Sequence, residues 1–141
     1  MKKMADWEGH MHRASLLLSM LLLASSHTPA AEPWLSGEAL TRMVSGNTAY
    51  CRHLSRPSSG RTYFAPDGTM HGIRRGEPRS GTWHVSGDTL CTNWGEKDYC
   101  SRYQSDGNGG HYKLTLAGKR VVHIEQWQHG DKVDMPVAGM E

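Results

Sequence analysis

The sequence has little cysteine, little net charge and a single phenylalanine, and these shortages exclude several classes of protein. Its three cysteines form no Cys-x-x-Cys pair, so neither a zinc knuckle nor a thioredoxin-type redox pair is indicated. The formal net charge of +2 is too small to indicate nucleic-acid binding without a localised basic patch. Charged residues make up only 21%, so a strongly charged disordered chain is also excluded. The length of 141 residues fits one domain.

Motifs of common enzymes are missing as well. The chain has no Gly-x-Ser-x-Gly elbow, no His-Glu-x-x-His and no glycine-rich phosphate loop. The segment 106–110 resembles part of a calcium loop but lacks the bidentate glutamate that such a loop requires. The sequence leaves an enzymatic role undecided, favours a non-catalytic protein and indicates no cofactor.

One hydrophobic run, residues 14–24, stands out in an otherwise polar chain. It follows basic residues, precedes a short polar stretch ending at Ala30 and Ala31, and is shorter than the roughly 20 residues of a membrane span. These features are typical of a secretory signal peptide, with Met1 or Met11 as the start. The alternatives are an uncleaved anchor and a buried helix. We therefore predict a signal peptide over 1–31 with cleavage near Ala30 or Ala31, a β domain over 32–129, a flexible tail over 130–141, and a periplasmic or secreted protein without a membrane span after cleavage.

Export to an oxidising compartment predicts that two of the three cysteines pair. Gly95-Glu96 suits a two-residue hairpin turn, which places Cys91 opposite Cys100 at a site without hydrogen bonds. Such sites bring Cα atoms to about 4.5 Å, which a disulfide accepts. The alternative is a hairpin with two reduced thiols. Cys51 is left as a buried residue, a rival disulfide partner or a thiol for an intermolecular bond.

Sixteen glycines, five tryptophans and five tyrosines favour a turn-rich β protein. Ser36 can cap a helix over 37–44 that Gly46 ends, and Leu40 and Val44 lie on one side of it. Between turn signals, the chain predicts short strands at 48–52, 61–65, 69–73, 82–85, 89–94, 99–103, 111–116 and 121–127, with loops at 55–60, 76–81 and 106–110. The expected fold is mainly β: a single antiparallel β-sandwich or small barrel of seven or eight short strands, with one short N-terminal helix.

The last two predicted strands suggest a register. Placing Lys113 opposite Glu125 opposes unlike charges and puts Leu114 beside Ile124. The expected core comprises Trp83, Val85, Leu90, Tyr112, Leu114, Leu116, Val122 and Ile124.

Four short motifs carry a family resemblance. They are Gly46-Asn47-Thr48, the Phe-x-Pro-Asp-Gly-Thr hairpin from Phe64, Gly81-Thr82-Trp83 and the two-cysteine hairpin. With them, most of residues 38–107 resembles a family of small exported bacterial proteins of unknown function. The resemblance implies an exported antiparallel β fold, and it carries over no activity or site.

Two groups of residues are candidate binding sites. His71, His84 and His123 could converge on one sheet face and bind zinc or copper, although scattered surface histidines explain them too. The segment 52–79 holds six arginines against two acids, a local net charge of about +4. The residues expected to bind a partner are Arg61, Arg74, Arg75, Arg79 and Trp94.

Together these features predict an exported, non-catalytic binding module. It would act through loops and an Arg-rich edge on a protein partner or small ligand, such as an envelope protein or an anionic polymer, and not on nucleic acid. One alternative is a histidine-based periplasmic metal-binding protein. The other is an inhibitor of a cell-envelope hydrolase, because residues 59–63 faintly resemble the inhibitory loop of exported barrel-shaped lysozyme inhibitors. A hollow barrel would indicate a small ligand, and a filled one would indicate binding through loops. The sequence leaves the ligand and the oligomeric state open.

Overall fold

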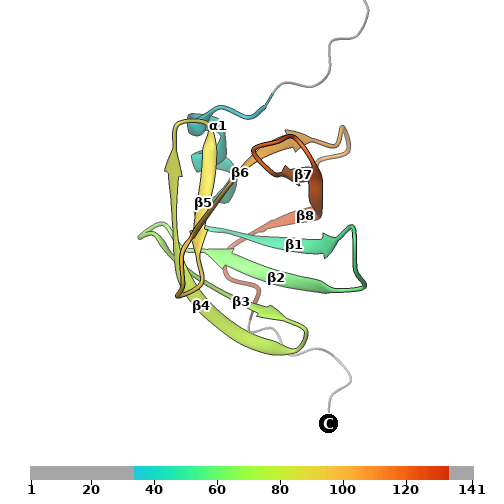
Figure 1. The fold of residues 1–141 in the computed structure, drawn as a ribbon. Coiled ribbons are helices and arrows are strands. Elements are labelled where there is room, and N and C mark those ends of the chain that lie inside the picture. Colours follow the sequence, from blue (N-terminus) through green and yellow to red (C-terminus); the bar gives the residue numbers. More distant parts are fainter. Residues whose placement is uncertain (1–33, 134–141) are drawn as a thin grey trace, which may run out of the picture.

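The computed structural model describes residues 34–133. In them, eight antiparallel strands close into a barrel, and one short helix precedes the first strand (Figure 1). The expected mainly β fold is confirmed, as a barrel rather than a sandwich. Each strand pairs with its neighbours in the chain, and β1 pairs with β8 to close the sheet. The elements are α1 (Gly37–Val44), β1 (Asn47–His53), β2 (Ser59–Phe64), β3 (Thr69–Arg74), β4 (Glu77–Ser86), β5 (Thr89–Asn93), β6 (Asp98–Ser105), β7 (His111–Leu114) and β8 (Arg120–His129).

Helix α1 has the predicted bounds and closes one end of the barrel. The Ser36 hydroxyl accepts a hydrogen bond from the Ala39 amide at 3.2 Å, which satisfies one of the free donors at the helix start. Leu40 and Val44, four residues apart, are fully buried in the core. The first turn is also fixed to the β4–β5 turn, where the Asp88 carboxylate accepts from the Gly37 amide at 2.9 Å.

The predicted loop at 76–81 is wrong, because β4 already begins at Glu77. Arg75 and Gly76 alone make the turn between β3 and β4, both with positive φ angles (54° and 78°), as two-residue hairpin turns require. The turn-forming residues Pro78 and Gly81 therefore lie within a ten-residue strand.

The two-cysteine hairpin forms as predicted. Cys91 lies opposite Cys100 in the β5–β6 ladder, and a disulfide joins them. Cys51 is a free thiol on β1.

The predicted core is mostly confirmed, with one error. Leu116 is 60% exposed because β7 ends at Leu114 and the chain turns there. Of the other predicted core residues, Val85 and Tyr112 are part-buried, while Trp83, Leu90, Leu114, Val122 and Ile124 are buried.

The predicted register of the last two strands is also wrong. Lys113 lies opposite Val122, and a bulge between Lys113 and Leu114 puts Leu114 opposite Arg120. Glu125 instead pairs with Arg52 at 2.6 Å. Lys113 therefore lacks the acidic partner that the sequence suggested.

The described residues after β8, 130–133, are the first four of the predicted tail and are held against the barrel. The Gly130 amide donates to the Gly46 carbonyl at 2.8 Å, and the Lys132 amide donates to the Thr48 hydroxyl at 3.0 Å. Val133 is buried. The rest of that tail, 134–141, and the predicted signal peptide, 1–31, lie outside the described residues. Within residues 34–133, no helix is long and apolar enough to cross a membrane.

Candidate ligand-binding site

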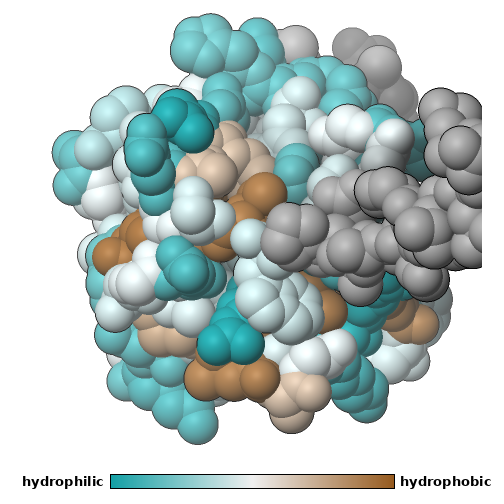
Figure 2. Space-filling model, turned by 90° about the horizontal axis from the view of Figure 1, so that it is seen from above, coloured by the Kyte–Doolittle hydropathy of each residue, from teal (hydrophilic) through white to brown (hydrophobic). Residues whose placement is uncertain are grey.

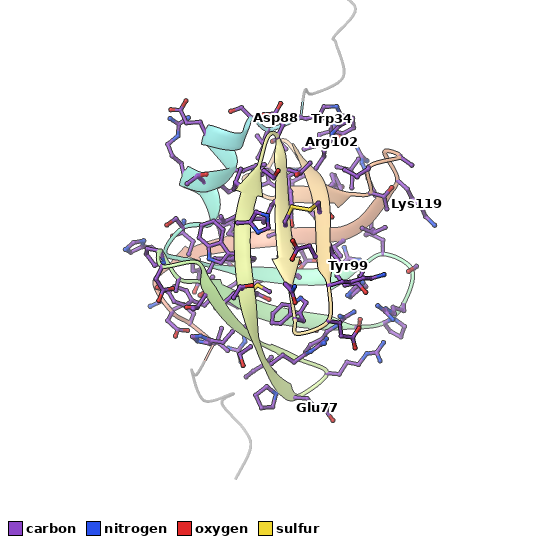
Figure 3. All side chains as sticks on the ribbon, turned by 60° about the vertical axis from the view of Figure 1, so that its left-hand side comes forward. Trp34, Glu77, Asp88, Tyr99, Arg102 and Lys119 are labelled. Atoms are coloured by element: carbon purple, nitrogen blue, oxygen red, sulfur yellow. A yellow bond between two sulfur atoms is a disulfide. The ribbon has the colours of Figure 1, made fainter. Side chains whose placement is uncertain are left out.

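The two ends of the barrel differ. Since neighbouring strands alternate in direction, the connections after β1, β3, β5 and β7 lie at the end opposite α1. Figure 3 shows this arrangement: Asp88 lies near α1, and Glu77 lies at the far end. At the α1 end, apolar residues appear as separate spots among hydrophilic ones in the face seen in Figure 2. The candidate site lies at the far end of the barrel. We call the end formed by the connections after β1, β3, β5 and β7 the mouth.

A cavity of about 130 Å³ opens toward the mouth inside the barrel. Ala49 on β1, Gly60 on β2 and Gly72 on β3 line it and add little side-chain volume, which leaves this half of the interior hollow. A wider groove of about 630 Å³ lies outside it at the same end and shares Arg74, Arg79, Trp94 and Lys113 with it. The cavity is therefore reached through the mouth.

The cavity wall is apolar on one side and cationic on the other. The apolar lining includes Phe64, Val122 and Ile124, all buried members of the core. The polar lining includes Cys51, His53, Arg74, Arg79, Tyr103 and Lys113.

Lys113 faces inward because of its place in the ladder. Its cross-strand partners are Tyr103 on β6 and Val122 on β8, both buried. Residues directly opposite each other project from the same face of a sheet, so Lys113 shares the inner face with them. Burial lowers the pKa of Lys113, and the Arg74 charge lowers it further, although the Cys51 thiolate would act in the opposite sense.

Arg74 is held at the mouth by His53. Its Nη2 lies 2.9 Å from His53 Nε2. A guanidinium can only donate, so His53 Nε2 accepts and the ring is neutral. Burial lowers the pKa of His53, and the positive charges of Arg74 and Arg56 lower it further, which favours this neutral form.

Arg79 is held by an aromatic ring. Its guanidinium carbon lies 5.4 Å from the centre of the Trp94 ring, within the range of a cation–π contact. Arg79 lies on β4 and Trp94 directly follows the neighbouring strand β5, and both line the cavity and the outer groove.

The cavity carries positive charge without a matching acid. No acidic side chain lines the cavity within the described residues, where the ionisable lining groups are cations, His53, Tyr103 and Cys51. Burial raises the pKa of the Cys51 thiol to about 11, even though Lys113 and Arg74 oppose the shift. Cys51 is therefore a neutral thiol at physiological pH, and the net charge of the cavity stays positive.

The five residues predicted to bind a partner do not all lie at one place in the structure. Arg74, Arg79 and Trp94 meet at the mouth. Arg75 is exposed at the tip of the β3–β4 turn. Arg61 donates to the Lys132 carbonyl at 3.3 Å and so helps to hold the segment after β8.

The structure does not bring the three candidate metal ligands together. His71 lies 2.7 Å from Asp131, His123 Nε2 donates to the Asp106 carboxylate at 2.8 Å, and His84 is exposed on β4. Among residues 34–133, no group of three or more histidine, cysteine, aspartate or glutamate side chains could hold a metal ion. His71 and His123 instead each pair with a different aspartate.

The segment compared with an inhibitory loop, residues 59–63, lies in a strand. It forms most of β2, which is paired with β1 on one side and β3 on the other. Its backbone is therefore occupied in the sheet and is not displayed as a loop.

Among the polar residues that line the cavity, Cys51, His53 and Lys113 carry no binding signal in the sequence. Cys51 and His53 are two apart on a predicted strand, so period-two alternation could have placed them on one face. Lys113 could not be found, because its place depends on the register of β7 against β8, in which Val122 and not Glu125 lies opposite it.

The fold and the site define a closed eight-stranded antiparallel barrel with a cation-lined cavity at one end. No protein-family model, curated protein or solved structure matches this chain. The resemblance to a family of small exported proteins therefore stays a prediction, and the functional argument depends on the cavity itself.

Proposed function

We propose that the protein is an exported, non-catalytic binding module that takes a small ligand into the mouth of its barrel. The observation that carries the proposal is the cavity of about 130 Å³ inside a closed barrel, open to the wider groove at one end. Small-ligand sites are concave and largely apolar, with a few convergent polar groups. Phe64 and Ile124 supply such an apolar wall, and Lys113 and Arg74 supply the polar groups.

Two features support export. A disulfide joins Cys91 and Cys100, and disulfides persist mainly in oxidising compartments. The hydrophobic run at 14–24 has the length and flanks of a signal peptide.

The chemistry of the cavity supports binding rather than catalysis. Its only thiol, Cys51, is protonated at physiological pH, and a thiol is a poor nucleophile in that form. Its histidine, His53, already accepts a hydrogen bond from Arg74, so Nε2 is not free to take a proton from a substrate.

A cavity-filling variant tests the proposal. Ala49 is fully buried and lines the cavity, so Ala49→Leu adds side-chain volume where a ligand would lie. Ala39→Leu makes a similar change on α1, at the other end of the barrel. We expect benzyl alcohol to shift the backbone amide NMR signals of cavity residues in the parent protein and in Ala39→Leu, but not in Ala49→Leu.

Melting curves of both variants show whether they are folded. Shifts that persist unchanged in folded Ala49→Leu, or shifts confined to the outer surface, would contradict the proposal.

A further inference from the structure

We infer that the ligand is a compact organic anion with an apolar body, such as an aryl or short-chain carboxylate. Its carboxylate lies between Lys113 and Arg74 at the mouth, and its hydrocarbon part lies against Phe64 and Ile124. This inference depends on the proposed function, because it names the class of ligand for the same cavity.

The charge of the cavity gives the first step. Taking a cation out of water is costly unless an anion or a set of acceptors replaces the lost hydration. Lys113 reaches into the barrel, yet no hydrogen bond or ion pair of its ammonium is found within the described residues, and its former candidate partner Glu125 binds Arg52. An anionic ligand supplies the missing charge.

The arrangement of donors gives the second step. Lys113 and Arg74 both line the cavity and the outer groove, so the two cations lie where the cavity meets the mouth. Arg74 uses one guanidinium nitrogen on His53, so its other N–H groups are available. A planar carboxylate accepts two hydrogen bonds from an arginine and a further one from a lysine, so it fits this pair of donors.

The size of the cavity gives the third step. A cavity of 130 Å³ is close to the roughly 150 Å³ of an engineered apolar cavity that holds benzene. A benzene-sized body fills it and leaves one charged group at the mouth. A long lipid chain does not fit in this volume.

The rim of the mouth argues against a large polyanion as the main ligand. Glu77, Glu96 and Asp98 are exposed among the cations of the rim, so a polymer lying across it would meet carboxylates as well. Only inside the cavity is the charge of one sign.

The test compares benzoate with benzyl alcohol, its uncharged counterpart, by isothermal titration calorimetry at low ionic strength. We expect benzoate to bind at least tenfold more tightly. Lys113→Met and Arg74→Met should each weaken benzoate binding by about 10- to 100-fold, the range for a hydrogen bond to a charged group. Both variants should change the affinity for benzyl alcohol by less than about threefold, since they keep the apolar wall.

Matched controls come from neighbouring residues. Arg75→Met makes the same change one residue from Arg74, at the exposed tip of the turn, and Lys119→Met does so on the exposed β7–β8 turn. Both should bind benzoate as the parent protein does. Lys113→Arg keeps the charge and should restore most of the affinity, which separates loss of charge from loss of folding.

The outcomes separate this inference from the proposed function. If benzoate and benzyl alcohol bind equally tightly and neither binds to Ala49→Leu, the inference that the ligand is an anion is overturned. The proposed small-ligand site is then still supported. If inorganic phosphate binds as tightly as benzoate, the inference that the ligand has an apolar body is overturned. If neither aromatic probe binds, or if Ala49→Leu binds both unchanged, both proposals fall.

Discussion

Replacing Lys113 by methionine should make the protein more stable at neutral pH. The ammonium is carried into the barrel between Tyr103 and Val122 without a compensating acid, so folding removes much of its hydration. Methionine has a similar length, adapts to irregular space and has no charge to desolvate. In other proteins, replacing buried charges by apolar side chains of similar volume is often neutral or stabilising by about 1–4 kcal/mol. Because Lys113 lies near an opening, we expect the lower part of that range, about 1–2 kcal/mol. For a domain of about 100 residues, that corresponds to a rise in melting temperature of at least about 4 °C.

The gain should depend on pH in a defined direction. Burial lowers the pKa of Lys113 below its value in the unfolded chain, so the penalty is fully present where both states are protonated. As the pH rises through the lowered pKa, the folded protein releases the proton first and the penalty declines. The advantage of Lys113→Met should therefore be largest at neutral pH and shrink toward pH 10–11, near the ordinary lysine pKa of 10.5.

Urea unfolding at several pH values, followed by tryptophan fluorescence, measures this difference. Lys119→Met, on an exposed turn, should change the unfolding free energy by less than about 0.5 kcal/mol and serves as the control. A stability of Lys113→Met below that of the parent at pH 7, or a gain that does not change with pH, would refute the reasoning about an uncompensated charge.

Three further changes test the framework that carries the cavity. Replacing Cys91 and Cys100 together by alanine should lower the unfolding free energy by roughly 2–3 kcal/mol, measured by urea unfolding, because the short loop between them is no longer closed in the unfolded chain. Ser36→Ala should cost about 1 kcal/mol in the same assay, since the Ala39 amide loses its cap, whereas Ser36→Asp should cost much less. Gly81→Ala should lower the melting temperature by several degrees, because a Cβ there would collide with the Asn93 carbonyl oxygen in the β4–β5 ladder, while Gly87→Ala meets no neighbouring atom and tests only the positive φ of a turn.

The sequence predicted those parts of the fold that depend on neighbouring residues. The cap at Ser36 and the spacing of Leu40 and Val44 specify α1 within one short stretch of chain. The Cys91–Cys100 pairing follows from a turn whose length fixes the register on both sides. In both cases the determining residues lie within about ten positions of each other, so local rules suffice.

The errors lie where local rules compete. Charge pairing placed Lys113 opposite Glu125, but the observed register puts Val122 there, three residues away, and Glu125 joins Arg52 on β1. That arrangement depends on closure of the barrel between β1 and β8, which joins residues such as Arg52 and His123 that are 71 positions apart. No pattern within β7 and β8 specifies it. The loss of one predicted ion pair is also what leaves the cavity with unbalanced charge.

The two cations at the mouth should contribute to binding in different ways. Arg74 is already fixed by its hydrogen bond to His53, so it loses little side-chain freedom when an anion arrives. Lys113 has no such partner among the described residues and must be ordered by the ligand, although the anion replaces the hydration that the barrel removed. His53→Ala should therefore weaken benzoate binding by releasing Arg74, while leaving benzyl alcohol binding unchanged. If His53→Ala weakens benzoate binding and Lys113→Met weakens it just as much in that variant as in the parent, the two contributions to affinity are independent. One is the positioning of Arg74, and the other is the desolvation of Lys113. A His53→Ala variant that binds benzoate like the parent would show instead that Arg74 needs no support, and the role of the histidine would have to be sought elsewhere.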